Sequence, residues 1–154
     1  MPETRHLFQK SRFFENLLEH RFLHDLSRHY ALEEEPRFLN VLRSDVDMFG
    51  IDLVLALGDQ IRHVQLKTRS RKPPSKPYDI SELVWKEKHG CVIWICYNPS
   101  NLEPIDYWVL GFPLPEMSLF SASKRIGFRR VKMQKAEHPR ASLERVANLL
   151  FPKL

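Results

Sequence analysis

The sequence predicts an α/β fold in which a mixed β-sheet is flanked by helices. Three observations support this prediction: the segments follow the order α-β-β-α-β-β-α, Gly58 and Asp59 join two strand-like segments, and residues 91–97 form an apolar run. The glycine favours a hairpin, and an apolar strand is typical of the covered centre of a sheet. A chain of 154 residues can bury about two thirds of its unfolded surface, so one domain, residues 1–154, is expected.

The amino-terminal half begins with a predicted helix over residues 8–30, which contains no proline or glycine. Its apolar stripe is defined by four side chains at helical spacing: Phe22, Leu23, Leu26 and Tyr30. The acidic segment 33–36 ends in proline and predicts a turn. Residues 49–57 and 61–68 then predict the two strands of the hairpin.

The carboxy-terminal half begins with residues 69–79, where three prolines and four Lys or Arg predict an extended loop. The elements after this loop are predicted, in order, as a helix, two strands and a closing helix: residues 80–89, 91–97, 107–112 and 141–151. Residues 125–133 are a candidate for one further strand before the closing helix.

Positive charge is concentrated in two segments, 62–76 and 124–135, each with six Lys or Arg and no acid. The formal net charge is +5, and a basic protein attracts polyanions. The two segments either line a phosphate-binding groove or form solvated loops. The candidate phosphate contacts in them are Arg69, Arg71, Lys72, Lys76, Arg129 and Arg130.

The sequence predicts a cytoplasmic protein without membrane contact. Its amino terminus lacks the apolar stretch of a secretory signal, and the run 91–97 is too short to cross a bilayer. Cys91 and Cys96 are five positions apart on one predicted strand, so we expect them on opposite faces as buried, unreactive thiols.

The register of the hairpin follows from a two-residue turn at Gly58 and Asp59. Leu57 then pairs with Gln60, and the same count places Asp52 opposite Gln65 and Gly50 opposite Lys67. Opposed side chains share a face of the sheet. This register therefore gathers Asp52, Gln65 and Lys67 on one face, with Gly50 leaving room for a ligand in front of Lys67.

An acid, an amide and an ammonium at one place match the needs of phosphodiester hydrolysis. Asp52 offers oxygen ligands to Mg²⁺ and Gln65 a weaker carbonyl ligand, while Lys67 orients or deprotonates water or stabilises charge on the phosphate. The alternative without a catalytic role is an ion pair between Asp52 and Lys67 on a solvent-exposed face of the sheet, with Gln65 as a filler.

A fourth candidate, Glu19, lies at the edge of the apolar stripe of the first helix. Glu15, one turn earlier, is the neighbouring candidate. The alternative for Glu19 is a surface acid paired with Arg12 or Lys10.

These residues resemble the motif of the PD-(D/E)xK nuclease superfamily. Asp52 matches its aspartate, Gln65 its second acid, Lys67 its lysine and Glu19 its helical glutamate. The resemblance implies a restriction-endonuclease-like fold with an α-β-β-α-β core, in which Asp52, Gln65 and Glu19 bind Mg²⁺, with Mn²⁺ as a substitute. Gln65 removes one negative charge from that site, which Glu19 or the upstream acids Asp45 and Asp47 would replace. Asp45 and Asp47 are otherwise loop acids that cap backbone groups.

The sequence therefore predicts a magnesium-dependent endonuclease that hydrolyses DNA and acts as a homodimer. The alternative is a module that kept the nuclease fold, lost cleavage and binds nucleic acid or a protein partner.

Overall fold

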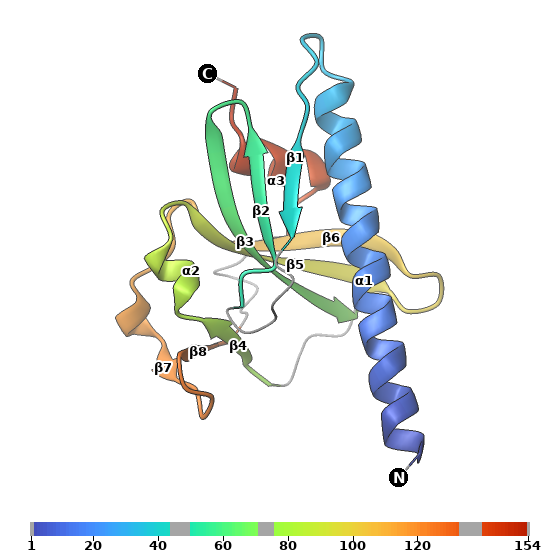
Figure 1. Cartoon of the computed structure of the whole chain (residues 1–154), viewed down its shortest axis with the longest axis vertical. Helices are drawn as coiled ribbons and strands as arrows, with labels where there is room; N and C mark the ends of the chain where they lie inside the picture. The colour runs from blue at the N-terminus through green and yellow to red at the C-terminus, as the bar shows by residue number, and fades with distance from the viewer. Residues whose placement is uncertain (1, 44–49, 71–75, 133–139, 154) are drawn as a thin grey trace.

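The structure is a computed structural model that describes residues 2–43, 50–70, 76–132 and 140–153. It confirms an α/β architecture with a mixed sheet and flanking helices (Figure 1). The main sheet has the strand order β1-β2-β3-β5-β6. Its strands are β1 (Asn40–Arg43), β2 (Leu53–Leu57), β3 (Gln60–Ser70), β5 (Gly90–Asn98) and β6 (Glu103–Leu110).

A smaller sheet lies beside the main one, with the order β4-β8-β7. Its strands are β4 (Tyr78–Ser81), β7 (Ser121–Ala122) and β8 (Phe128–Val131). The helices are α1 (Pro2–Ala31), α2 (Leu83–Lys86), α3 (Leu143–Leu150) and a 3₁₀ turn, η1 (Met117–Leu119).

The predicted hairpin register is confirmed between β2 and β3. Leu57 pairs with Gln60 and Leu53 with Val64, as the two-residue turn requires. β3 then pairs with β5 in parallel, and β4 and α2 lie along the crossover between these two strands. The remaining pairs of the main sheet, β1 with β2 and β5 with β6, are antiparallel.

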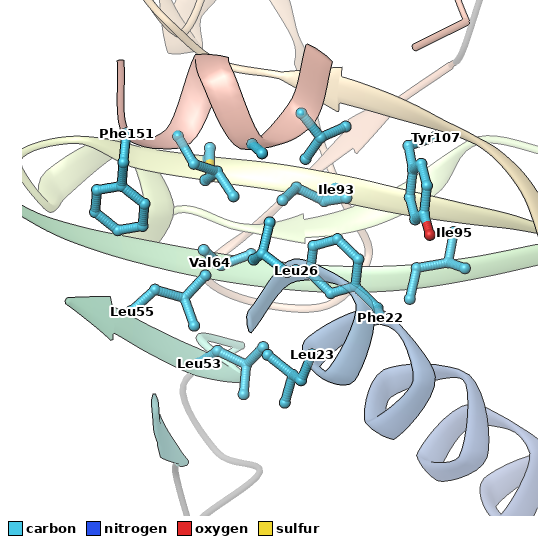
Figure 2. Packing of buried hydrophobic residues seen from close by; sticks show 14 of the residues in the cluster. Phe22, Leu23, Leu26, Leu53, Leu55, Val64, Ile93, Ile95, Tyr107 and Phe151 are labelled. Carbon is cyan, nitrogen blue, oxygen red and sulfur yellow. The ribbon is translucent and has the colours of Figure 1, made fainter. Parts of the chain in front are cut away.

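The main sheet is covered on both faces, which explains the apolar strand β5. On one face α1 and α3 pack against the sheet through side chains such as Phe22, Leu26, Ile93 and Phe151 (Figure 2). The other face forms a second core with β4, α2 and β8, whose buried members are Ile80, Val84, Val92, Trp94, Cys96, Trp108, Leu110 and Val131. Burial on both sides permits a continuous run of apolar residues where a one-sided strand would alternate.

The predicted placement of the two cysteines is confirmed, because Cys91 belongs to the helix-covered core and Cys96 to the second core. Both are buried, free thiols. Burial raises the pKa of each thiol to about 12. At neutral pH they are therefore protonated and poor nucleophiles.

The helix predicted over residues 80–89 is wrong for most of its length. Ile80 and Ser81 belong to β4, and only Leu83–Lys86 are helical. The pairing of β4 with β8, which joins Ile80 to Arg129 across 49 positions of the chain, outweighs the local helical pattern.

Other element boundaries in the structure also differ from the predicted ones. The first hairpin strand begins at Leu53 instead of residue 49, and β3 and β4 occupy both ends of the predicted loop 69–79. β6 ends at Leu110 because Phe112 adopts a left-handed conformation with φ of 64°. β8 is shorter than the predicted strand 125–133. The first residues of that predicted strand form a turn instead, in which Phe128 N donates to Arg125 O. β1 and β7 were not predicted.

No helix in the described part of the chain is both long and apolar enough to cross a membrane.

We predict that neither cysteine of the native protein reacts with a thiol-specific reagent at pH 7.5, because both are buried and protonated. In denaturant, two thiols per chain should react. The measurement is the absorbance released by an aromatic disulfide reagent. Rapid reaction of either thiol in the native state would contradict the two-sided burial of β5.

Candidate functional site

A cleft of about 440 Å³ opens between α1 and the final residues of β3. Figure 1 shows α1 passing the end of β3, with its amino-terminal turns extending further. The described residues that line the cleft are Arg12, Glu15, Asn16, Glu19, Asp52, Leu66, Lys67, Thr68 and Tyr78. The structure thus brings together Glu19, Asp52 and Lys67, together with the neighbouring candidate Glu15.

Asp52 lies immediately before β2, where this strand's pairing with β3 comes to an end. Its backbone N–H donates to Val64 O (3.0 Å), and its Oδ2 accepts the backbone N–H of Leu66 (2.6 Å). The carboxylate therefore takes the place that a backbone carbonyl would have in a longer β2. These two bonds fix Asp52 at the edge of β3, beside the cleft.

Lys67 is a partly buried cation on β3, and it also lines the cleft. Burial lowers the pKa of its ammonium group below the usual 10.5, and the negative charge of Asp52 opposes this shift. The positive charge of Arg125 lowers the pKa further, while Glu15 and Asp79 raise it. Lys67 is thus less hydrated than a surface lysine and surrounded by charges of both signs.

The helix α1 contributes its two acids from one wall of the cleft. Glu19 Oε1 lies 3.3 Å from Arg43 Nε on β1, an ion-pair partner that the sequence did not predict. Glu15 Oε1 accepts the hydroxyl of Ser11 (3.4 Å), one turn earlier. Both glutamates are one turn apart on the same helix, so their carboxylates face the same cleft.

Gln65 does not line the cleft. Its side chain is 3% exposed, and its Oε1 accepts the backbone N–H of Ser81 in β4 (3.1 Å). Gly50, which has φ of +68°, lies against the same place, and a Cβ there would be 2.5 Å from Ser81 Cβ. The space left by this glycine therefore accommodates β4, whereas the sequence predicted room for a ligand. Gln65 connects the two sheets.

The candidate phosphate contacts are scattered. Arg69 is only 6% exposed, and its guanidinium carbon lies 4.1 Å from the centre of the Trp108 ring. Arg129 Nε lies 2.8 Å from Glu82 Oε1, so that charge is already neutralised. Lys76 and Arg130 are exposed. The other two candidates, Arg71 and Lys72, lie outside the described residues.

Sequence reasoning missed Tyr78, Asn16 and Thr68 as lining residues. Tyr78 lies in the segment predicted as a loop, and only the pairing of β4 brings it to the cleft. It packs edge-on against Trp94, with ring centres 5.6 Å apart. Thr68 directly follows Lys67, so proximity along the strand was the available signal for it.

The cleft offers carboxylate oxygens, the donor type that Mg²⁺ prefers, from Asp52 and the two glutamates of α1. Within the described ranges, no three acidic, histidine or cysteine side chains are grouped closely enough to hold a metal ion. Mg²⁺ does not require three, because it usually keeps several waters and binds through one or two carboxylates and substrate phosphates. The donor set therefore fits Mg²⁺ by type. Asp45 and Asp47 lie outside the described residues.

No family model matches the chain, and neither a curated protein nor a solved structure matches it.

We predict that Gln65→Glu lowers the free energy of unfolding by about 1–3 kcal/mol, because it places a carboxylate in a buried position built for an amide. Since residue 65 does not reach the cleft, the added acid should leave Mg²⁺ affinity unchanged. Urea unfolding with and without Mg²⁺ measures both quantities. Gln60→Glu, at the start of the same strand, is the matched control. Tighter Mg²⁺ binding without a loss of stability would place residue 65 in the metal site.

We predict that Lys67→Met raises the free energy of unfolding at pH 7 by about 1 kcal/mol, because folding removes part of the hydration of the Lys67 ammonium group. The unfolded chain binds the Lys67 proton more tightly than the folded protein does. Stability should therefore rise with pH between the lowered pKa of the folded state and the ordinary 10.5.

The methionine variant should lack this rise. Urea unfolding from pH 7 to 10.5 measures the difference, with the exposed Lys88→Met as control. A loss of stability at pH 7 would show instead that the charged pair with Asp52 stabilises the fold.

Proposed function

We propose that the protein is a metal-dependent endonuclease that hydrolyses DNA phosphodiester bonds in the cleft between α1 and β3. The observation that carries the proposal is the meeting of Asp52, Lys67 and the acids of α1 in this cleft. These residues come from three separate elements. An ordinary surface pair between Asp52 and Lys67 would not account for two further carboxylates or for the partial burial of the lysine.

The strand arrangement also supports the proposal. After α1 and the additional strand β1, the chain forms the antiparallel β2–β3 hairpin, and β5 is added in parallel beside β3 after β4 and α2. This order fits the α-β-β-α-β core that the resemblance to PD-(D/E)xK nucleases implies. In that core, Asp52 directly precedes one hairpin strand and Lys67 lies on the other, which agrees with the superfamily motif.

The cofactor in this proposal is Mg²⁺, with Mn²⁺ as a substitute, held by Asp52 and Glu19 or Glu15. When bound, the ion supplies electrostatic stabilisation of the negative charge that grows on the phosphate. Gln65 is not assigned as a ligand because its oxygen is bonded to Ser81 N.

Lys67 acts on the phosphate from the floor of the cleft. As an ammonium ion in a partly dehydrated place, it stabilises additional negative charge on the phosphate oxygens more strongly than a solvated lysine would. Its lowered pKa also increases the fraction of neutral amine, which can accept a proton from the attacking water. The negative charge of Asp52 limits this shift in the pKa.

When Glu19 binds the metal ion, its carboxylate must leave the ion pair with Arg43 or be shared between the two cations. This pair lies partly in solvent, where such interactions contribute only about 0–1 kcal/mol. A divalent ion and a phosphate in the cleft would outweigh that contribution. We therefore assign Arg43 as the resting partner of Glu19.

The proposal takes double-stranded or branched DNA as the substrate and the cytoplasm as the place of action. Cutting both strands of a duplex needs two such sites, which a homodimer would supply. The net charge of +5 favours a polyanionic substrate.

A second candidate function is supported by the position of Gln65. Residue 65 is a glutamine, and its buried side chain joins the two sheets. The cleft therefore has one acid fewer than the superfamily motif provides. A domain of this kind would bind nucleic acid, or a protein partner, through the same cleft without cutting.

We predict that the protein cuts supercoiled plasmid or branched DNA with Mg²⁺ or Mn²⁺ and not with a chelator. Lys67→Ala and Asp52→Asn should each lower the rate by about 100-fold or more. Asparagine keeps an oxygen for the Leu66 N–H, so the loss would reflect charge and not the hairpin edge. Gel electrophoresis of timed samples measures the rate.

Lys88→Ala, which removes an exposed lysine outside the cleft, should cut at the wild-type rate. Cleavage that survives both cleft substitutions would locate the activity elsewhere. DNA that is bound but never cut with either metal ion would favour the second candidate function.

A further inference from the structure

The turn between β7 and β8, residues 123–127, is tied to the β4 side of the cleft. Ser123 Oγ donates to Asp79 Oδ1 (2.6 Å), and Asp79 directly follows the cleft residue Tyr78. The backbone N–H of Arg125 donates back to Ser123 Oγ (3.1 Å). These bonds hold the backbone of Arg125 at a fixed position relative to β4.

The guanidinium of Arg125 lies over the ring of Phe128. Its central carbon lies 3.8 Å from the centre of the Phe128 ring, and Phe128 is only 7% exposed. A guanidinium stacked on an aromatic face keeps its N–H groups free along its edge, where they can bind a phosphate in a two-pronged geometry. Stacking before binding also reduces the entropy lost when an anion is bound.

Arg125 has no carboxylate partner among the described residues, although it is an exposed cation. Arg129, four positions later in the sequence, does have a carboxylate partner. Arg129 Nε bonds to Glu82 Oε1 (2.8 Å), and its Nη1 bonds to Phe120 O (3.2 Å). Of these two arginines on the same basic segment, Arg125 is therefore the one with donors available to an anion.

Arg125 lies outside the group of described residues that line the cleft, but its positive charge acts on Lys67. After burial, which lowers the pKa of Lys67 most, Arg125 is the cation that lowers it further. Two cations that repel each other in this way are both stabilised when an anion lies between them. A phosphate chain that places one phosphate at Lys67 and another at Arg125 meets this requirement.

We propose that Arg125 binds a backbone phosphate of the nucleic acid strand on the β4 side of the cleft, as a positioning residue for the phosphate at Lys67. This inference rests on the proposed function, since it assigns the path of the same substrate. It gives Arg125 the role that the sequence assigned to Arg129.

The test measures binding of a fluorescent DNA duplex by anisotropy, with a chelator present so that cutting plays no part. Arg125→Gln should weaken binding and lower the slope of log Kd against log salt by about 1. Arg125→Lys keeps the charge but loses the stacked, two-pronged geometry, so it should weaken binding less. Arg28→Gln removes an exposed arginine near the far end of α1 and is the matched control.

The inference is overturned if Arg125→Gln binds DNA with the wild-type slope of log Kd against log salt. It is also overturned if Arg28→Gln loses as much affinity as Arg125→Gln, since net charge alone would then explain the effect. Failure of the proposed function is distinguished by a separate cutting assay with Mg²⁺. DNA that is bound with the predicted change at Arg125 but never cut would support the Arg125 assignment and contradict the nuclease. Absence of any DNA binding by the wild-type protein would overturn both.

Discussion

The arrangement of the cleft depends on the unequal lengths of the two hairpin strands. β2 begins at Leu53, whereas β3 continues to Ser70, and the carboxylate of Asp52 bonds to Leu66 N–H where the backbone pairing stops. A strand edge carries unsatisfied backbone groups that must find partners. Here a charged side chain supplies one partner, so an acid is fixed beside Lys67. The same end of β2 leaves the space into which α1 contributes Glu15 and Glu19.

The second constraint is that the main sheet is buried on both faces by different elements. α1 and α3 cover one face and are joined by the bond from Tyr30 Oη to Ala147 O (2.7 Å), while the smaller sheet covers the other. Gln65 lies at the meeting point of the two sheets and bonds to Ser81 N. A residue whose position in the motif suggests a metal ligand is thereby used to hold β4, which in turn places Tyr78 at the cleft.

The many arginines have different physical roles, although the sequence presents them as two basic segments. Arg62 and Arg69 are buried and stack on Phe151 and Trp108, where they contribute packing more than surface charge. Arg129 is neutralised by Glu82. The surface attraction for a polyanion is therefore smaller than the count of basic residues suggests, and it is concentrated at a few exposed positions. If the proposed function holds, this distribution favours a defined path for the substrate strand over general attraction.

Local sequence determined the mixed α/β class, the long helix α1, the register of the hairpin and the opposite orientation of Cys91 and Cys96. Each of these follows from periodicity or turn chemistry within a few residues. Because the register follows from the turn, the closeness of Asp52 to the Lys67 segment of β3 was also predictable. Tertiary structure alone decided the short α2, the strand β4, the role of Gln65 and the partners of each arginine. These depend on pairing between segments far apart in the chain, such as β4 with β8, whose hydrogen bonds no local pattern encodes.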